Sequence, residues 1–364
     1  MIPMVDLRRQ YKNLKADIDA VITEVLNSSR FILGPNVSEL EEEIAAYHGV
    51  PFAIGVANGT DALFLALKVC GIGNGDEVIT TSFTFIATAE VISRLNATPV
   101  FVDVDPDTFN IDPGKLKKKI TRKTKAIIPV HLFGHPADMD SIVNLCQRYN
   151  IKIIEDCAQA FGAEYKGKKV GTIGDCGCFS FFPSKNLACY GDGGMVITRE
   201  ENVAEQIRLL RNHGSAVKYY HNAIGYNSRL DEIQAAIVRV KLRKIDKFNN
   251  SRRANADIYR SCIKRDDVIL PAESAGCRHV YHQFTIRSKK RDSIMDYLKR
   301  NDISSAIYYP LPLHKQEVFA DQITISGELP VSEECAAEVL SLPMFPELRE
   351  EEIQYISDVI NNVP

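Results

Sequence analysis

The first two thirds of the chain alternate short β-forming runs with segments of helical period, and this alternation limits the fold more than any other feature. The predicted strands are Phe52–Val56, Glu77–Thr80, Pro99–Asp103, Lys125–Val130, Lys152–Glu155, Cys178–Phe182 and Met195–Thr198. The predicted helices between them are Asp61–Val69, Ala87–Leu95, Met139–Tyr149 and Val203–Arg211. Strands that alternate with helices form a mainly parallel sheet covered by helices on both faces. We therefore predict an α/β fold.

The last third of the chain has fewer strands. A charged stretch, Leu230–Arg252, is predicted to be one long helix that leads out of the α/β region. Beyond it, a strand at His279–Ile286 and helices at Asp292–Leu298 and Glu350–Val363 indicate a smaller α+β domain. The predicted division is an N-terminal segment associated with the small domain (residues 1–20), a large domain (residues 21–245) and a small C-terminal domain (residues 246–364).

Charge and cysteine content argue against several classes of protein. The chain carries 44 Lys and Arg against 47 Asp and Glu, a net charge of −3, so we expect no nucleic-acid binding by bulk charge. No apolar stretch approaches the roughly 20 residues that span a bilayer, and Met1–Tyr11 lacks the apolar core of a signal peptide. Nine scattered cysteines, an odd number, argue against a disulfide framework, and the close pair Cys176 and Cys178 is a poor metal site without further ligands. We predict a cytoplasmic protein that binds neither membrane nor metal.

The segment Ala57–Leu63 joins a predicted strand to a predicted helix and has the features of an anion site. Gly59 allows close backbone approach, and Thr60 lies near the first turn of the helix. Free amides and the helix dipole at such a junction bind a phosphate dianion. An ordinary helix N-cap fits the same residues, so this segment indicates a site only together with its neighbours.

A second strand ends in the sequence Glu155-Asp156-Cys157-Ala158-Gln159. Ligands of open α/β sheets bind beyond the carboxyl ends of the strands. A carboxylate at Asp156 can hold the ring nitrogen of an aromatic cofactor protonated, and Gln159 can hydrogen-bond a phenolic oxygen or lie against the ring. The alternative is a solvated aspartate in a loop.

A third strand ends in an aromatic run followed by Lys185, and a fourth is followed by Phe85. In a partly dry pocket, desolvation and a cationic ring lower the pKa of a lysine, and the neutral amine forms a Schiff base and moves protons. Phe85 can cover the second face of the ring. A surface lysine and a core phenylalanine are the ordinary alternatives. Taken together, the four junctions describe a site for pyridoxal 5′-phosphate (PLP).

Ten stretches of the chain resemble the fold-type I PLP enzymes and, within them, the sugar aminotransferases of the DegT/StrS group. They are FILGP, NGTDAL, GDEVIT, FTFIATA, EDCAQAFGA, FSFFPSKNL, GDGGM, RNHG, GYNSRLDEIQAAI and LSLPMFP. They run in family order from near residue 30 to near residue 346, so the resemblance covers nearly the whole chain.

The resemblance implies a role for the residues around the cofactor ring. Lys185 matches the lysine that bonds to PLP, and Asp156 matches the partner of the ring nitrogen. Gln159 matches the family's residue beside the ring, and Phe85 its stacking aromatic.

At the phosphate end, Gly59 and Thr60 match the family's binding turn, with Ser180 as a further ligand. Asn227 matches an asparagine that reaches the cofactor phosphate of the neighbouring subunit, which implies a homodimer with two shared active sites. Arg229 lies beside it and either holds an anionic group or serves the interface. The segment from Tyr309 to His314 resembles a family stretch near the sugar, although a loop histidine is an equal alternative.

The resemblance implies that L-glutamate donates an amino group to a nucleotide-linked keto sugar. The sequence Asn227–Asp231 is similar to relatives that aminate C3, of the dTDP-3-keto-6-deoxyhexose or UDP-3-keto-N-acetylglucosaminuronate type. Amination at C4 and amination of a cyclitol ketone remain alternatives, as does a catalytically silent regulatory homologue. The presence of Lys185 argues against the family's sugar dehydratases, in which histidine replaces it. A nicotinamide dehydrogenase is disfavoured because no strand is followed by G-x-G-x-x-G.

Overall fold

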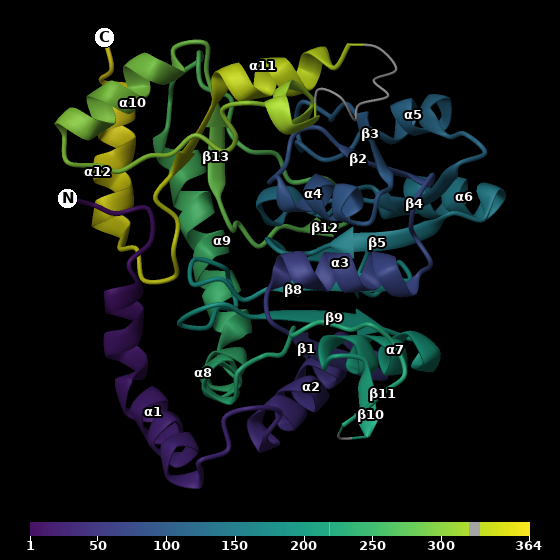
Figure 1. The fold of residues 1–364 in the computed structure, drawn as a ribbon. Coiled ribbons are helices and arrows are strands. Elements are labelled where there is room, and N and C mark those ends of the chain that lie inside the picture. Colours follow the sequence, from purple (N-terminus) through teal and green to yellow (C-terminus); the bar gives the residue numbers. More distant parts are fainter. Residues whose placement is uncertain (218, 320–327) are drawn as a thin grey trace.

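A seven-stranded sheet forms the centre of the larger part of the molecule (Figure 1). The structure, a computed structural model, describes residues 1–217, 219–319 and 328–364. The strands lie in the order β1 (Phe52–Val56), β9 (Gly194–Thr198), β8 (Cys176–Ser180), β5 (Lys152–Asp156), β4 (Thr124–Ile128), β2 (Glu77–Thr81) and β3 (Thr98–Val102). β9 runs in the opposite direction to the other six strands of this sheet. The predicted α/β fold with a mainly parallel sheet is confirmed.

Helices cover both faces of this sheet because successive strand residues point to opposite sides. In β9, Val196 packs into the core beneath α3 (Gly59–Val69), α4 (Ala87–Arg94) and α7 (Glu201–Arg211). Its neighbours Met195 and Ile197 pack into the opposite core, beneath α2 (Pro35–His48) and α8 (Glu232–Leu242). Further along the same face, α6 (Met139–Tyr149) packs over β4 and β5. With both faces buried, the strands carry apolar residues at successive positions, as in Ile153 and Ile154 of β5, instead of alternating with polar ones.

A second core lies at one end of the molecule, where Figure 1 shows α10, α12 and β13 together. It is built from β13 (Phe284–Arg287), β14 (Val339–Leu342), α10 (Arg291–Arg300), α12 (Glu350–Asn361) and the end of α9 (Ile245–Cys262). The short elements are α5 (Pro113–Leu116), α11 (Pro330–Glu338), β6 (Glu164–Tyr165), β7 (Lys168–Lys169), β10 (Ser215–Val217), β11 (Tyr220–His221), β12 (Cys277–Arg278) and the 3₁₀ turns Lys117–Lys119, Leu132–Gly134, Leu313–Lys315 and Glu317–Phe319. No helix in the described ranges is long and apolar enough to cross a bilayer.

The predicted helix Leu230–Arg252 is two helices, so this prediction is wrong. α8 ends at Leu242 and α9 begins at Ile245, and Lys244 between them has φ −119° and ψ 2°. Leu242 and Ile245 are both buried in the core of the large sheet. At the break the chain changes direction, so that α9 runs toward the second core while Leu242 and Ile245 stay in the first (Figure 1).

The predicted strand His279–Ile286 is also shorter than expected. Only the part from Phe284 onward joins a strand, β13. The preceding residues turn back to the large domain, where Val280 donates to the Gly134 carbonyl at 3.0 Å and Gln283 donates to the Phe133 carbonyl at 3.3 Å. Tertiary hydrogen bonds thus replace the expected strand.

The residues of the predicted N-terminal segment 1–20 contact two different parts of the molecule. Ile2 forms a parallel bridge with Ile303, and the Met344 amide donates to Met4, so the first residues lie against the second core. The following α1 (Leu7–Ser28) contacts α8 instead, through side chains such as Leu14 and Ile18. The predicted boundary at residue 20 therefore falls inside a helix.

Candidate active site

A cavity of about 370 Å³ opens at the carboxyl edge of the sheet. Asp156 ends β5 and Ser180 ends the parallel neighbour β8, so both side chains emerge at the same edge. Of the residues predicted from the sequence, the cavity is lined by Gly59, Thr60, Phe85, Asp156, Gln159, Ser180, Lys185 and Tyr309. Residues spread over 250 positions of sequence thus meet in one place because strand ends converge there.

Lys185 lies in a turn that directly follows β8, and its backbone amide donates to the Phe182 carbonyl at 2.8 Å. The side chain lines the cavity beside Ser184 and is half-buried. Protein atoms around the amine remove its hydration and lower the pKa of Lys185 to about 8, while the nearby carboxyl of Asp156 opposes this shift. At neutral pH a much larger fraction of this amine is therefore uncharged than in an ordinary lysine.

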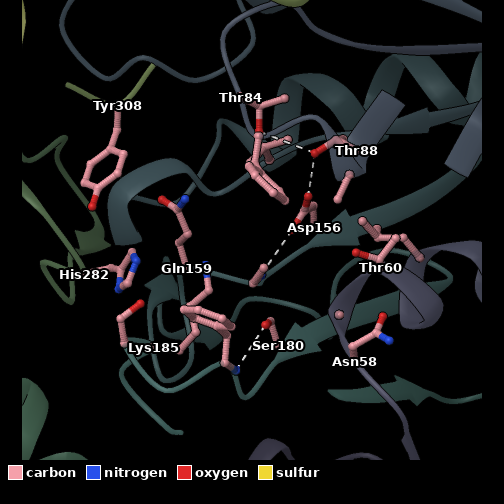
Figure 2. Close-up of a pocket in the computed structure, with 18 of the residues that line it drawn as sticks. Asn58, Thr60, Thr84, Thr88, Asp156, Gln159, Ser180, Lys185, His282 and Tyr308 are labelled. Atoms are coloured by element: carbon pink, nitrogen blue, oxygen red, sulfur yellow. Dashed lines mark hydrogen bonds between the residues drawn. The ribbon is translucent and has the colours of Figure 1, made fainter. Parts of the chain in front are cut away.

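Asp156 is buried and held at both carboxyl oxygens (Figure 2). Thr88 donates from its hydroxyl to Oδ2 at 2.8 Å, and the Ala158 amide donates to Oδ1 at 3.1 Å. Burial raises the pKa of Asp156, and the Thr88 hydroxyl, the Ala158 amide and the Lys185 amine each oppose this. These two hydrogen bonds thus fix the orientation of the carboxylate. A cation close to it would further favour the charged form of Asp156.

The residue before Asp156 anchors the end of β5. Both oxygens of Glu155 accept hydrogen bonds from backbone amides, from Gly171 at 2.8 Å and from Ile173 at 2.8 Å and Gly174 at 2.6 Å. His131 lies 3.0 Å from the same carboxylate through Nε2, and its Nδ1 accepts from the Ala137 amide at 3.0 Å. Glu155, His131 and Cys157 lie close enough to suggest a metal site, but the carboxylate and both imidazole nitrogens are already used by these hydrogen bonds.

At the other end of the cavity, α3 begins at Gly59. The Asn58 side chain caps the helix by accepting from the Asp61 amide at 2.7 Å. The amides of Gly59 and Thr60 have no acceptor within the helix, as at any helix start. A Cβ on Gly59 would lie 2.6 Å from the Cβ of Ser180, so only glycine lets this turn approach the Ser180 hydroxyl. Two free amides, a hydroxyl and a helix N-terminus fit a phosphate group.

Gln159 is fixed by a hydrogen bond at each end of its amide. Its Oε1 accepts from the Phe133 amide at 2.7 Å, and its Nε2 donates to the Tyr309 hydroxyl at 3.0 Å. Since the Tyr309 oxygen accepts this bond, its own proton is left to donate elsewhere, and the side chain lines the cavity.

Phe85 is 54% exposed and lies with its ring centroid 6.2 Å from that of Tyr309, so an apolar ring face is open to a planar ligand.

Three predicted residues do not line the cavity of this chain. Asn227 is exposed and forms a bridge with Asn212, whose side chain accepts from Arg229 at 3.0 Å. His314 is buried, with Nδ1 2.5 Å from the Ser82 hydroxyl and Nε2 3.1 Å from Glu333. It fastens its loop to the end of β2, which sequence motifs could not show.

The cavity also includes residues that the sequence prediction missed. They are Asn58, Leu63, Thr84, Ala87, Thr88, Val130, Ala158, Phe182, Ser184, Asp192, His282, Gln283 and Tyr308. Thr84 and Thr88 belong to the FTFIATA stretch and could have been considered with Phe85. His282 and Gln283 carried no signal, because their position depends on the turn that shortens β13.

The chain has the fold of the PLP-dependent aminotransferases, as comparison with a solved structure shows. DesV of S. venezuelae, solved in complex with a ketimine intermediate, is 43% identical with a TM-score of 0.96 over 99% of this chain and 97% of that one. The chain belongs to the DegT/DnrJ/EryC1/StrS aminotransferase family, whose model matches residues 12–361. The predicted family is confirmed.

Two curated relatives are more similar in sequence. A UDP-N-acetyl-3-dehydro-alpha-D-glucosamine 3-aminotransferase of Acidithiobacillus ferrooxidans is 50% identical over 99% of this chain and 97% of its own length. A protein of Geobacillus stearothermophilus named pleiotropic regulatory protein is 52% identical over 99% of this chain and 97% of its own length.

Proposed function

We propose that this protein transfers an amino group from L-glutamate to C3 of a nucleotide-linked keto sugar, with PLP as its cofactor. The observation that carries the proposal is that Lys185 and Asp156 line one cavity, together with the helix start at Gly59 and Thr60. The C3 position is supported by the similarity to the Acidithiobacillus 3-aminotransferase. A cytoplasmic location stays a prediction, in keeping with nine cysteines that are all free thiols.

The residues present fit PLP in both chemistry and space. Asp156 would face the ring nitrogen, the amides of Gly59 and Thr60 with the Ser180 hydroxyl would hold the phosphate, and Phe85 would cover a ring face. When bound, PLP supplies an aldehyde that bonds reversibly to amines and a ring that accepts the electrons left when a substrate proton departs.

Lys185 would carry the proton in both half-reactions. With a pKa of about 8, about a tenth of the amines are neutral at pH 7, against about three in ten thousand for an ordinary lysine. The neutral Nζ can take a proton from the α-carbon of the donor and return one to the carbon that receives the nitrogen. With PLP bound, the carboxylate of Asp156 would face the ring nitrogen and favour its protonated form.

The acceptor sugar would lie where Tyr308, Tyr309 and His282 line the cavity. Tyr309 has a hydroxyl proton free to donate, because Gln159 already donates to its oxygen. His282 lies with Nδ1 3.2 Å from the Asn186 side chain, and burial lowers its pKa well below the usual range, so it is neutral. These groups offer uncharged hydrogen bonds, which suit hydroxyl and carbonyl groups of a sugar.

The homodimer with shared sites is part of the proposal. Asn227 is exposed and lies outside the cavity of its own chain, as a residue that serves a neighbour must. Nearby exposed apolar side chains, including Tyr219, Tyr220 and Ile224, offer a surface for a second copy.

The experiment that tests the function starts from protein carrying pyridoxamine phosphate. Nucleotide-linked 3-keto and 4-keto sugars and a free cyclitol ketone are added in turn, and the return of the PLP absorbance is followed. We expect the PLP absorbance to return with a 3-keto nucleotide sugar. We expect no turnover in Lys185→Ala. Turnover in Lys185→Ala, or a response to the cyclitol alone, would contradict the proposal.

A regulatory role without catalysis is the second candidate, since one close relative is named a regulatory protein. The cavity keeps both Lys185 and Asp156, which a binding protein would not need. A PLP spectrum that stays unchanged with every amino donor would favour the regulatory role.

A further inference from the structure

Thr88 is the one side chain that donates a hydrogen bond to Asp156 among the residues the structure describes. It lies in the first turn of α4, is fully buried, and its Oγ1 is 2.8 Å from Oδ2 of Asp156. Figure 2 shows this bond as a dashed line between Thr88 of α4 and Asp156 at the end of β5. The contact joins residues 68 positions apart, so it exists only in the folded chain.

The bond has two consequences for the carboxylate. It fixes the rotation of the Asp156 side chain, since the other oxygen is bound to the Ala158 amide at 3.1 Å. It also favours the charged form, because an O–H donor stabilises a carboxylate more than a carboxylic acid. Among the groups that oppose the effect of burial on the pKa of Asp156, the Thr88 hydroxyl is the strongest.

A second hydroxyl supports the first. Thr84 lies four positions earlier, before α4 begins, with its Oγ1 3.4 Å from that of Thr88. When Thr88 gives its proton to Asp156, its oxygen can accept from Thr84. Hydrogen bonds arranged in such a chain polarise and strengthen one another.

We propose that Thr88 is a positioning residue that aims the carboxylate of Asp156 and keeps it ionised, so that the cofactor ring nitrogen retains its proton. The inference rests on the proposed function, because it assumes that PLP binds with its ring nitrogen at Asp156. In this role Thr88 acts through Asp156.

The test compares Thr88→Val with Thr88→Ser in the PLP-loaded enzyme. Valine has nearly the same shape without the hydroxyl, whereas serine keeps it. The ¹⁵N chemical shift of ring-labelled PLP reports directly whether the nitrogen is protonated, and turnover is measured beside it. We expect Thr88→Val to move the shift toward the unprotonated value and to lower turnover about tenfold or more. Thr88→Ser is expected to keep the wild-type shift and most of the turnover.

Thr80 provides a matched control outside the cavity. It is also a fully buried threonine, whose hydroxyl donates to the Ile128 carbonyl at 2.9 Å. Thr80→Val should lower stability and leave the ¹⁵N shift unchanged. If Thr88→Val does not fold, Thr88→Cys, which has only a weak S–H donor, should move the shift in the same direction.

The outcomes separate the two proposals. A protonated ring nitrogen and full turnover in Thr88→Val, or in Thr88→Cys where the valine variant does not fold, would overturn the role of Thr88 and leave the proposed function intact. A wild-type protein that binds no PLP, or holds it with an unprotonated ring nitrogen, would overturn the proposed function itself.

Discussion

At the scale of single residues, burial acts on the two central groups in opposite directions. It lowers the pKa of Lys185 to about 8 and raises that of Asp156, so both uncharged forms are favoured before a cofactor adds its own charge. A second buried lysine shows that the shift alone does not mark a site. Burial also lowers the pKa of Lys241 to about 8, yet its Nζ lies 4.1 Å from the centre of the Tyr190 ring and does not line the cavity.

The lowered pKa of Lys185 predicts how the apo-protein takes up PLP. Below about pH 8 the amine is mostly protonated and cannot attack the aldehyde, whereas above it the neutral amine reacts. The rate of uptake should rise about tenfold per pH unit up to pH 8 and then level off. Stopped-flow absorbance between pH 6 and 10 measures this rate. Lys241→Met should give the same profile, and a rise that continues to pH 10 would contradict the assignment.

At the scale of elements, the end of β5 is stabilised by hydrogen bonds to a neighbouring turn. Glu155 is buried and accepts from three backbone amides of the 171–174 turn, while Asp156, next in sequence, faces the cavity. Opposite directions of successive strand residues thus give one carboxylate a structural role and the next a place in the site. The sequence prediction assigned the site carboxylate to Asp156 and gave Glu155 no role, and its anchoring of the 171–174 turn became visible only in the structure.

Replacing Glu155 by Gln should loosen this end of the sheet. The variant loses the negative charge and turns an amide N–H₂ toward backbone donors, leaving buried donors unpaired at a cost of about 2–4 kcal/mol. We expect the unfolding midpoint of the apo-protein to fall by about 5 °C or more, measured by circular dichroism. Glu164→Gln, at a partly exposed strand position, is the control and should change the midpoint little. An unchanged midpoint in Glu155→Gln would show that the turn does not depend on this carboxylate.

At the scale of the whole molecule, the proposed dimer assigns Asn227 and Lys185 of one chain to different active sites. The chain places Asn227 on an exposed loop and Lys185 in the cavity. In a symmetric dimer each site would then take one residue from each subunit.

Mixing two inactive variants tests this arrangement. Lys185→Ala and Asn227→Ala are each expected to lose most activity. Unfolded together and refolded at equal amounts, they should recover about a quarter of wild-type activity, because half of the dimers are mixed and each mixed dimer has one intact site. A mixture no more active than the average of the two variants would mean that each site belongs to a single chain.

Much of the site could be predicted from sequence because strand-end motifs carry local signals. Gly59, Asp156, Ser180 and Lys185 each lie at a strand-to-helix or strand-to-loop junction, and the parallel sheet brings such junctions to one edge. His282 and Gln283 lie in the same cavity without such a signal, since long-range hydrogen bonds and packing place them there.

The sequence by itself determined the α/β class, the family and the residue types available at the strand ends, because periodicity and motif spacing are local properties of the chain. Only the tertiary structure decided which of those residues meet. It broke the long helix at Lys244, brought His282 and Gln283 into the cavity, fastened His314 to Ser82 outside it, and set Thr88 against Asp156. Each of these depends on burying apolar surface and pairing polar groups from distant segments, and no window of sequence contains both partners.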